Sequence, residues 1–204
     1  GRGHRFAHAH SAEVLLHLYE DDGIDGFRRV DGQFGAALWD QRRKRLVLLR
    51  DFLGVRPLYY WSGPKGLVFS SEIKSLLRHS RVPRSLDEAA VSQFLTFTSV
   101  PGPQTLFRDI HKLPPGTAAI CTLDGSVKLE RYWDLLQDPV PETTGEKFYV
   151  DRVRELHEQS VIRRKIDGPV ASLLSGGNDS SANASLMARH GCAPLHTFTV
   201  GLAD

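Results

Sequence analysis

The sequence predicts two parts of different fold class: an α+β part built from antiparallel hairpins with helices, then the start of an α/β part with a parallel sheet. Along most of the chain, apolar residues alternate with period two around short turns, which is typical of hairpins. Near residue 170 the pattern changes to a continuous apolar run, a glycine-rich loop and a helical stretch. That order is typical of a βαβ unit whose strands are buried on both faces.

The α+β part is predicted to begin with a helix. Ser11 is the predicted N-cap and Gly23 the C-terminal stop, with apolar residues at helical spacing between them. Period-two alternation then predicts hairpins over residues 34–49, 58–69 and 117–133, the last around an Asp-Gly turn.

Two helices and a long connection are predicted between the second and third hairpins. A short helix covers residues 72–77, and Ser85 with Glu88 forms a capping box that opens the next helix. Prolines from Pro101 to Pro115 then predict an irregular connection.

Composition changes around Pro139 and Pro141, which predicts a linker over residues 138–145 between a first domain, 1–137, and a second, 146–204. Thr143 with Glu146 forms a capping box for the first helix of the second domain.

Charge and cysteine usage exclude several classes. The formal net charge of +2 argues against a nucleic-acid binder, whose domain is normally strongly basic. No apolar run reaches the ~18 residues of a membrane span. Cys121 and Cys192 lie far apart without a CxxC motif, which favours a reducing cytoplasmic setting. We expect both cysteines to act as small hydrophobic side chains. Because the only methionine is Met187, we expect an interior piece of a longer protein without a signal peptide.

The loop Ser175–Ser181 carries the chemistry. Two glycines let the backbone turn sharply, and N–H groups converge with the helix N-terminus on an anion. Asp179 would repel a phosphate unless a cation lies between them, so it predicts bound Mg²⁺. The loop has neither the Gly-Lys-Ser/Thr ending of the P-loop nor GxGxxG, which favours a pyrophosphate site.

SGGNDSS after a buried strand resembles the pyrophosphate loop of the ATP-pyrophosphatase superfamily. Together with the preceding part, the chain resembles the glutamine-dependent asparagine synthetases over nearly its whole length. Six segments fall in that family's order and spacing: Ala12–Tyr19, Asp31–Phe34 with Trp39–Asp40, Arg50–Asp51 with Gly54 and Pro57–Tyr60, Phe69–Lys74, Leu113–Gly116, and Tyr132–Trp133.

The resemblance implies an N-terminal-nucleophile-hydrolase-like domain that frees ammonia from glutamine with a cysteine. It also implies a Rossmann-like ATP-pyrophosphatase domain that adenylates the aspartate β-carboxylate. No catalytic residue of either reaction falls within the chain, which we expect to be inactive alone. By analogy, the residues that bind ATP and pyrophosphate are Leu173, Ser175, Gly176, Gly177, Asp179, Ser180 and Val200, and Asp179 holds Mg²⁺.

Two departures from the family pattern matter. Ser11 stands where the family has an acidic residue that contacts the amino group of glutamine. A neutral hydroxyl loses charge assistance, typically about a factor of two in hydrogen-bond strength. Asn178 stands where the family has an aliphatic residue. Alternatives are a β-lactam-synthetase-like acyl-adenylating enzyme without glutaminase activity, or a non-catalytic binding module.

Three further features are predicted to be structural. Arg42–Arg45 is a solvated turn, His8 and His10 lie in a solvated segment, and Arg50–Asp51 braces a hairpin. The expected partners are small molecules, namely ATP, glutamine and aspartate or another carboxylic acid.

Overall fold

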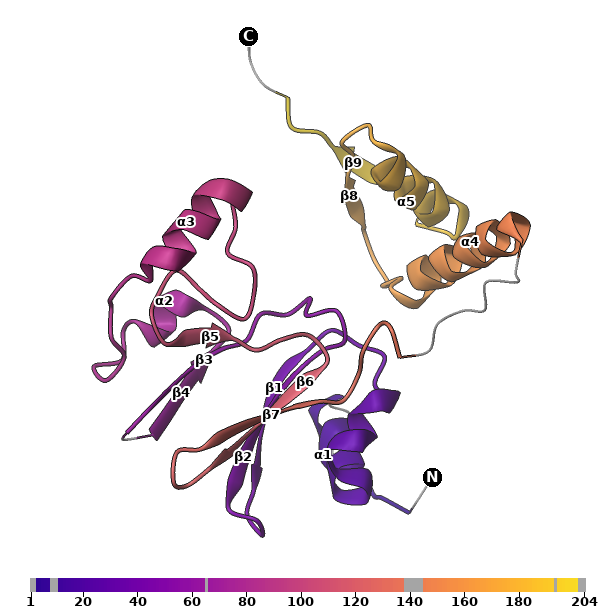
Figure 1. Ribbon diagram of the computed structural model, residues 1–204. Coiled ribbons are helices and arrows are strands. Elements are labelled where there is room, and N and C mark those ends of the chain that lie inside the picture. The colour runs from indigo at the N-terminus through magenta and orange to yellow at the C-terminus, as the bar shows by residue number, and fades with distance from the viewer. Residues whose placement is uncertain (1–2, 8–10, 65, 138–144, 193, 202–204) are drawn as a thin grey trace. The chain divides into compact units, whose positions relative to one another are not determined.

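The computed structural model describes residues 3–7, 11–64, 66–137, 145–192 and 194–201 (Figure 1). By their internal contacts the residues divide into two units, Gly1–Asp138 and Pro139–Asp204. The linker predicted over 138–145 falls at this division, and all of it except Gly145 lies outside the described residues.

The first unit contains a four-stranded antiparallel sheet. It is preceded by helix α1 (Ser11–Asp22), which was predicted, and by a 3₁₀ helix, η1 (Gly23–Arg29), which was not. The first and third predicted hairpins are confirmed, and they join edge to edge in the order β1-β2-β6-β7. The four strands are β1 (Gly35–Asp40), β2 (Arg45–Arg50), β6 (Thr117–Thr122) and β7 (Val127–Arg131).

A second antiparallel sheet has the order β4-β3-β5. The predicted second hairpin is confirmed as β3 (Tyr59–Gly63) and β4 (Gly66–Ser70). Strand β5 (Ile110–Lys112) lies inside the connection that was predicted to be irregular, and that part of the prediction is wrong. Three residues are too few to show a period, and β5 exists because it pairs with β3.

Helices α2 (Ile73–Leu76) and α3 (Glu88–Phe97) follow β4. The predicted Ser85 capping box is wrong, because the N-cap of α3 is Asp87, whose side chain accepts from the N–H groups of Ala89 and Ala90. Leu86 forms an isolated antiparallel bridge with Phe107, which keeps the chain extended up to the residue before the cap. The helix therefore begins later than the sequence pattern indicates.

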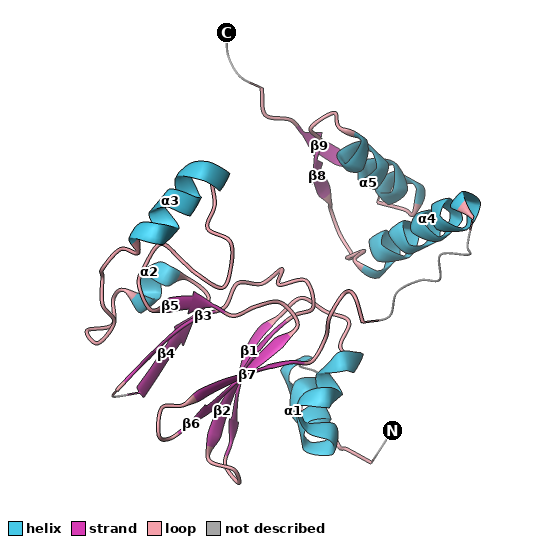
Figure 2. Ribbon diagram, viewed as in Figure 1, coloured by secondary structure: helices cyan, strands magenta, loops and turns pink. Residues whose placement is uncertain are grey.

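Alternating residues place the four-stranded sheet between two layers. Val47 and Leu49 of β2 pack with Tyr19 and Phe27 of α1 and η1, whereas Leu48 packs on the opposite face. The partners of Leu48 include Leu58, Tyr60 and Leu113, in and beside the second sheet. The other face of the second sheet packs against α2, where Trp61 of β3 and Ile110 of β5 cluster with Leu76 of the helix. The first unit thus has four layers: helix, sheet, sheet, helix (Figure 2).

The second unit consists of helix α4 (Glu146–Arg163) followed by a single βαβ element. The N-cap of α4 is Gly145, which has no side chain to cap the helix, and the predicted cap Thr143 lies outside the described residues. Strand β8 (Ala171–Leu173), helix α5 (Asn178–Arg189) and strand β9 (His196–Phe198) follow in the predicted order. Strands β8 and β9 pair in parallel, which confirms the change of sheet type that the sequence predicted. The predicted burial of these strands on both faces is wrong for the described residues, because β9 and most of β8 are exposed and no further strand or helix covers Leu173 and Phe198 there.

Candidate functional site

The glycine-rich loop joins the carboxyl end of β8 to the N-terminus of α5. Gly176 has a φ of +81°, a left-handed conformation that favours glycine, and a Cβ built there would meet nothing within 4 Å. Glycine is therefore required by the backbone conformation at this position and not by crowding. The open space beside Gly176 leaves room for a ligand to approach the main chain.

Two serine hydroxyls lie together across the loop. The Oγ atoms of Ser175 and Ser180 are 3.0 Å apart, and the Ser180 hydroxyl donates to the Gly177 carbonyl oxygen at 3.1 Å. The backbone N–H of Ser175 donates to the Ser180 Oγ at 3.3 Å. These bonds hold the loop as a tight turn over the first turn of α5 and place both hydroxyls beside the helix N-terminus.

The N-terminus of α5 has donors to offer. Its cap is Gly177, which has no side chain that could cap the helix, and the Gly177 N–H itself donates to the Ser175 Oγ at 3.4 Å. The first N–H groups of a helix have no partner within the helix, and the helix dipole adds positive potential there. Together with the two hydroxyls, this geometry suits a phosphate group.

Asp179 lies in the first turn of α5, and its side chain is exposed. The Asp179 carboxylate and the hydroxyls of Ser175 and Ser180, from the loop and the first turn of α5, are hard oxygen donors of the kind that Mg²⁺ prefers, and Mg²⁺ characteristically shares its coordination shell with phosphate oxygens. The donor set therefore fits a magnesium ion carried by a nucleotide. Asn178 is exposed as well, so its amide needs no buried partner.

Leu173 and Val200 lie at the same end of the two parallel strands. Leu173 of β8 pairs with Phe198 of β9. The N–H of Leu174 donates to the Phe198 carbonyl oxygen, and this bond keeps the two chains side by side where the loop begins and where β9 leads on to Val200. Both side chains are exposed, 76% for Leu173 and 88% for Val200. The structure thus brings all seven residues predicted to bind ATP to the carboxyl ends of the parallel strands β8 and β9.

Ser11, the predicted glutamine contact, is the first residue of α1, and its side chain lies outside the described part of the structure. The histidines His8 and His10 also lie outside the described residues.

Arg50 and Asp51 have the bracing role that the sequence predicted. The Arg50 guanidinium donates to the carbonyl oxygens of Arg56, Gly54 and Leu113. The Asp51 carboxylate accepts from the backbone N–H groups of Phe34, Val55 and Arg56 at 3.2, 2.8 and 3.0 Å. Both side chains are saturated by backbone groups, which suits a structural pair and not a catalytic one.

Residues 42–44 of the basic run form an exposed hairpin turn, as predicted, but the prediction is wrong for Arg45, which begins β2 and donates to the Tyr19 hydroxyl at 3.0 and 2.8 Å. The Asp40 carboxylate accepts from the backbone N–H groups of Arg42 and Arg43, and these bonds hold the turn. Chiefly through the bond from Arg43, the pKa of Asp40 is lowered to about 2.

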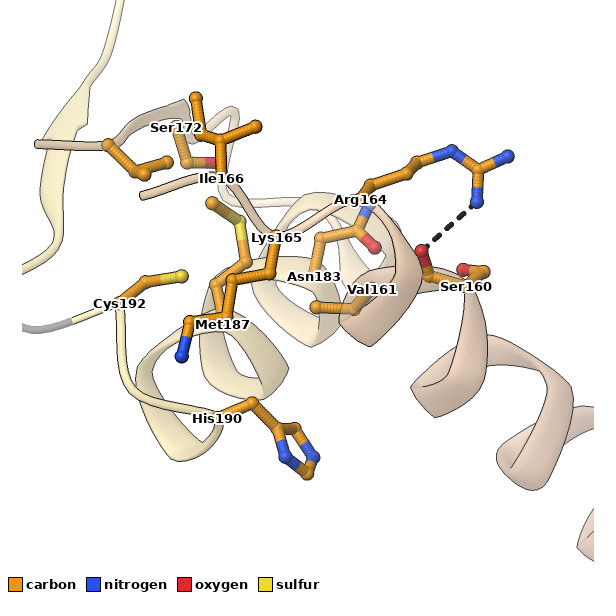
Figure 3. A pocket seen from close by; sticks show the side chains of 11 residues that line it. Ser160, Val161, Arg164, Lys165, Ile166, Ser172, Asn183, Met187, His190 and Cys192 are labelled. Carbon is orange, nitrogen blue, oxygen red and sulfur yellow. Dashed lines mark hydrogen bonds between the residues drawn. The ribbon is translucent and has the colours of Figure 1, made fainter. Parts of the chain in front are cut away.

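A cavity of about 460 Å³ lies within the second unit, and sequence reasoning did not find it (Figure 3). Its lining is mainly apolar but includes the cationic side chains of Arg164 and Lys165 and the sulfur atoms of Met187 and Cys192. None of the seven residues predicted to bind ATP lines it. The loop, with its convergent donors, is therefore the better candidate for a phosphate site.

A cavity of about 640 Å³ lies in the first unit and was not predicted from the sequence, although much of its lining belongs to segments of the family pattern. Three segments of the family pattern, separated in sequence, meet around it and supply Gln33, Phe34, Pro57, Leu58 and Phe69–Glu72. Each segment can be recognised from its own residues. Only the tertiary structure shows that the three segments line the same cavity.

The two cysteines differ in reactivity. Cys121 is buried in β6, and burial raises the pKa of its thiol to about 11, while Cys192 is partly exposed. At pH 8 we expect a thiol reagent such as DTNB to modify Cys192 quickly. Cys121 should react only on unfolding, because about one thiol in a thousand is ionised three pH units below its pKa. The Cys192→Ser variant should lose almost all of the fast phase of the DTNB reaction. If both thiols of the parent protein react at equal rates, the predicted protection of Cys121 is wrong.

Comparison with known proteins defines the class. Residues 1–133 match the family model described as "Glutamine amidotransferase domain", and the chain belongs to this family. Residues 152–204 match a second model, described as "Asparagine synthase". In the described residues, no helix is long and apolar enough to cross a membrane.

The curated relatives agree with this pair of models. The chain is 34% identical to asparagine synthetase [glutamine-hydrolyzing] 3 of Bacillus subtilis, over 98% of the chain and 33% of the relative. It is 30% identical to a putative asparagine synthetase [glutamine-hydrolyzing] 2 of Methanocaldococcus jannaschii, over 93% of the chain and 37% of the relative. A third relative, Amidase chry2 of Gibberella zeae, is 32% identical over 90% of the chain and 27% of its own length.

The chain spans about a third of the length of the curated relatives that it matches. Among solved structures, it is similar to a glutamine phosphoribosylpyrophosphate amidotransferase from B. subtilis, with a TM-score of 0.43 and 16% identity, over 96% of the chain and 40% of that structure.

Proposed function

We propose that the protein containing this chain is a ligase of the asparagine synthetase type, which uses ATP and glutamine to convert the aspartate side chain into an amide. One observation carries the proposal: a serine-glycine loop with phosphate-binding geometry follows a glutamine amidotransferase domain in the same chain. The relatives named as glutamine-hydrolysing asparagine synthetases support it.

The loop's part in the reaction is to hold the leaving group. A carboxylate is a poor electrophile, and its attack on the α-phosphorus of ATP gives an acyl-adenylate and releases pyrophosphate. Negative charge develops on that pyrophosphate. The Ser175 hydroxyl and the N–H groups at the start of α5, after Gly176 and Gly177, would donate to this charge, and the Ser180 hydroxyl would do so by turning its proton away from the Gly177 carbonyl oxygen. Ammonia then attacks the acyl carbon, and AMP leaves.

Asp179, with the hydroxyls of Ser175 and Ser180, would hold the Mg²⁺ that accompanies ATP. When bound, such an ion neutralises phosphate charge and polarises the reacting phosphoryl group. The backbone beside Leu173 and Val200, at the same sheet edge, would receive the adenine nucleotide.

The first unit would supply the ammonia donor site. We assign no catalytic residue of glutamine hydrolysis to this chain. The substrates of the proposed enzyme are small molecules. We propose that the enzyme is cytoplasmic, in keeping with the free thiols of Cys121 and Cys192.

A second candidate is favoured by Ser11. The neutral residue at a position that is acidic in the family removes a charged contact to the glutamine amino group. This suits an acyl-adenylating enzyme of the β-lactam synthetase type, in which the first domain has no glutaminase activity.

The test is ATP–pyrophosphate exchange by the protein that contains this chain, with a panel of carboxylic acids, alongside glutamate release from glutamine. Exchange with aspartate and release of glutamate are expected for the first candidate. Exchange with another acid and no glutamate release would establish the second. No exchange with any acid would refute both and leave a binding module.

A further inference from the structure

A cluster of histidine and carboxylate side chains lies on α1 and on the segment before it, within the first unit, and the proposed function does not use it. Glu13, His17 and Glu20 are spaced four and three residues apart, so they share one face of the helix. His4, from the segment before the helix, stacks on His17 with ring centroids 4.2 Å apart. One potential ligand atom from each of His4, His17 and Glu20 lies within 4.8 Å of the other two.

The two imidazole rings are oriented alike with respect to the carboxylates. The Nδ1 atoms of His17 and His4 face the same oxygen, Oε2 of Glu20, at 3.0 and 4.0 Å. The Nε2 atoms face outer carboxylates: His4 Nε2 is 2.8 Å from Asp21 Oδ1, and His17 Nε2 is 3.6 Å from Glu13 Oε1. In metal sites, one ring nitrogen binds the ion while the other donates its proton to a carboxylate. His4 has this arrangement, whereas His17 Nε2 faces the Glu13 carboxylate at 3.6 Å, beyond hydrogen-bond distance.

One nitrogen of the His17 ring lacks a hydrogen bond. His17 Nδ1 lies 3.0 Å from Glu20 Oε2, whereas its Nε2 is buried without a hydrogen-bond partner among the described residues and faces Glu13 Oε1 at 3.6 Å. A divalent cation beside Glu20 would bind the Nδ1 atoms of both rings and leave each Nε2 facing an outer carboxylate.

We propose that His4 Nδ1, His17 Nδ1 and the Glu20 carboxylate form a structural site for a divalent transition-metal ion. Two imidazoles and one carboxylate favour Zn²⁺ over Mg²⁺, and water completes the tetrahedral shell. Metal–ligand bonds of ~2.0–2.1 Å place tetrahedral donors about 3.3 Å apart. The cluster therefore closes on binding, and the ring planes, inclined at 29°, open further.

The site would fasten the segment 3–7 to α1. This segment already contacts the helix through a hydrogen bond from the Ala7 N–H to Glu13 Oε1 at 2.7 Å. His4 can shift toward the ion without unwinding the helix, because it belongs to that segment and not to α1. A metal ion here adds a strong cross-link between the segment and the helix face that carries His17 and Glu20.

The experiment uses untagged protein that has been dialysed against EDTA. Zn²⁺ binding is measured by calorimetry, Co²⁺ binding by visible absorption, and the melting temperature with and without Zn²⁺. We expect one ion per cluster, a tetrahedral Co²⁺ spectrum and a higher melting temperature. His17→Gln and Glu20→Gln should weaken Zn²⁺ binding by on the order of 100-fold. His4→Gln should do the same without touching the helix, and so separates loss of binding from loss of folding.

Two variants serve as controls. His196→Gln removes an exposed histidine of β9. The double variant His8→Gln/His10→Gln removes the two histidines that lie in the sequence between His4 and α1. Both should bind Zn²⁺ as the parent protein does. The proposal is refuted if the parent binds no Zn²⁺, if binding survives in His4→Gln, His17→Gln and Glu20→Gln, or if the His8/His10 double variant abolishes it.

Discussion

Replacing Asp51 with alanine is expected to lower the free energy of unfolding by about 3 to 5 kcal/mol. The Asp51 side chain is only 1% exposed, and its carboxylate accepts three backbone N–H bonds, from Phe34, Val55 and Arg56. Alanine leaves these donors without their acceptor and leaves the neighbouring Arg50 guanidinium without a nearby negative charge. The loop between β2 and β3, which supplies Arg56, Pro57 and Leu58 to the lining of the first-unit cavity, should loosen as well.

Urea unfolding followed by circular dichroism measures this loss. Asp25→Ala is the matched control, since the Asp25 side chain is 81% exposed and forms only a surface ion pair with Arg28. The control should change stability by about 0.5 kcal/mol or less. A change in Asp51→Ala as small as that of the control would show that the three bonds do not hold the loop.

Replacing Asp179 with asparagine is expected to reduce ATP–pyrophosphate exchange by on the order of 100-fold, the size of effect seen when one charge-stabilising group is lost from an active site. Asparagine keeps the size of the side chain but removes the charge that would hold Mg²⁺. Because Asp179 is exposed in the first turn of α5, the variant should lose only its charge–dipole stabilisation, about 0.3 to 1 kcal/mol, and stay folded. The variant should also need more Mg²⁺ for half-maximal exchange.

Asp167→Asn provides the matched control, because Asp167 is an exposed acidic residue of the same unit outside the loop. It should keep the exchange rate of the parent protein. Parent-like exchange and Mg²⁺ dependence in Asp179→Asn would remove Asp179 from the proposed site and leave the serine hydroxyls and α5 as its remaining groups.

The hairpins and the βαβ element were predictable because each is encoded by neighbouring residues. The alternation around β1 and β2 places Leu38 and Val47 on one face of the sheet, and turn residues fix where each strand ends. The phosphate loop is equally local, since its glycines, serines and helix N-terminus occupy one short stretch between β8 and β9.

Other features depend on partners that are distant in sequence. Strand β5 is defined by pairing Ile110 with Trp61, and the start of α3 is defined by the bridge between Leu86 and Phe107. No local pattern contains these contacts. The stacking of His4 on His17 was missed for the same reason, because a segment before the helix must fold back along it.

Local residue patterns were enough to predict the order of the elements, the change from antiparallel to parallel pairing, and the loop on which the proposed function depends. Turn chemistry and periodicity act over a few residues, so they can be recognised without the fold. Packing across the first unit was needed to show which residues cover the two faces of β2, that three separated segments line one cavity, and that Asp51 accepts from three backbone donors. Burial and hydrogen bonding of this kind depend on which surfaces meet, and that is set by packing across the whole unit.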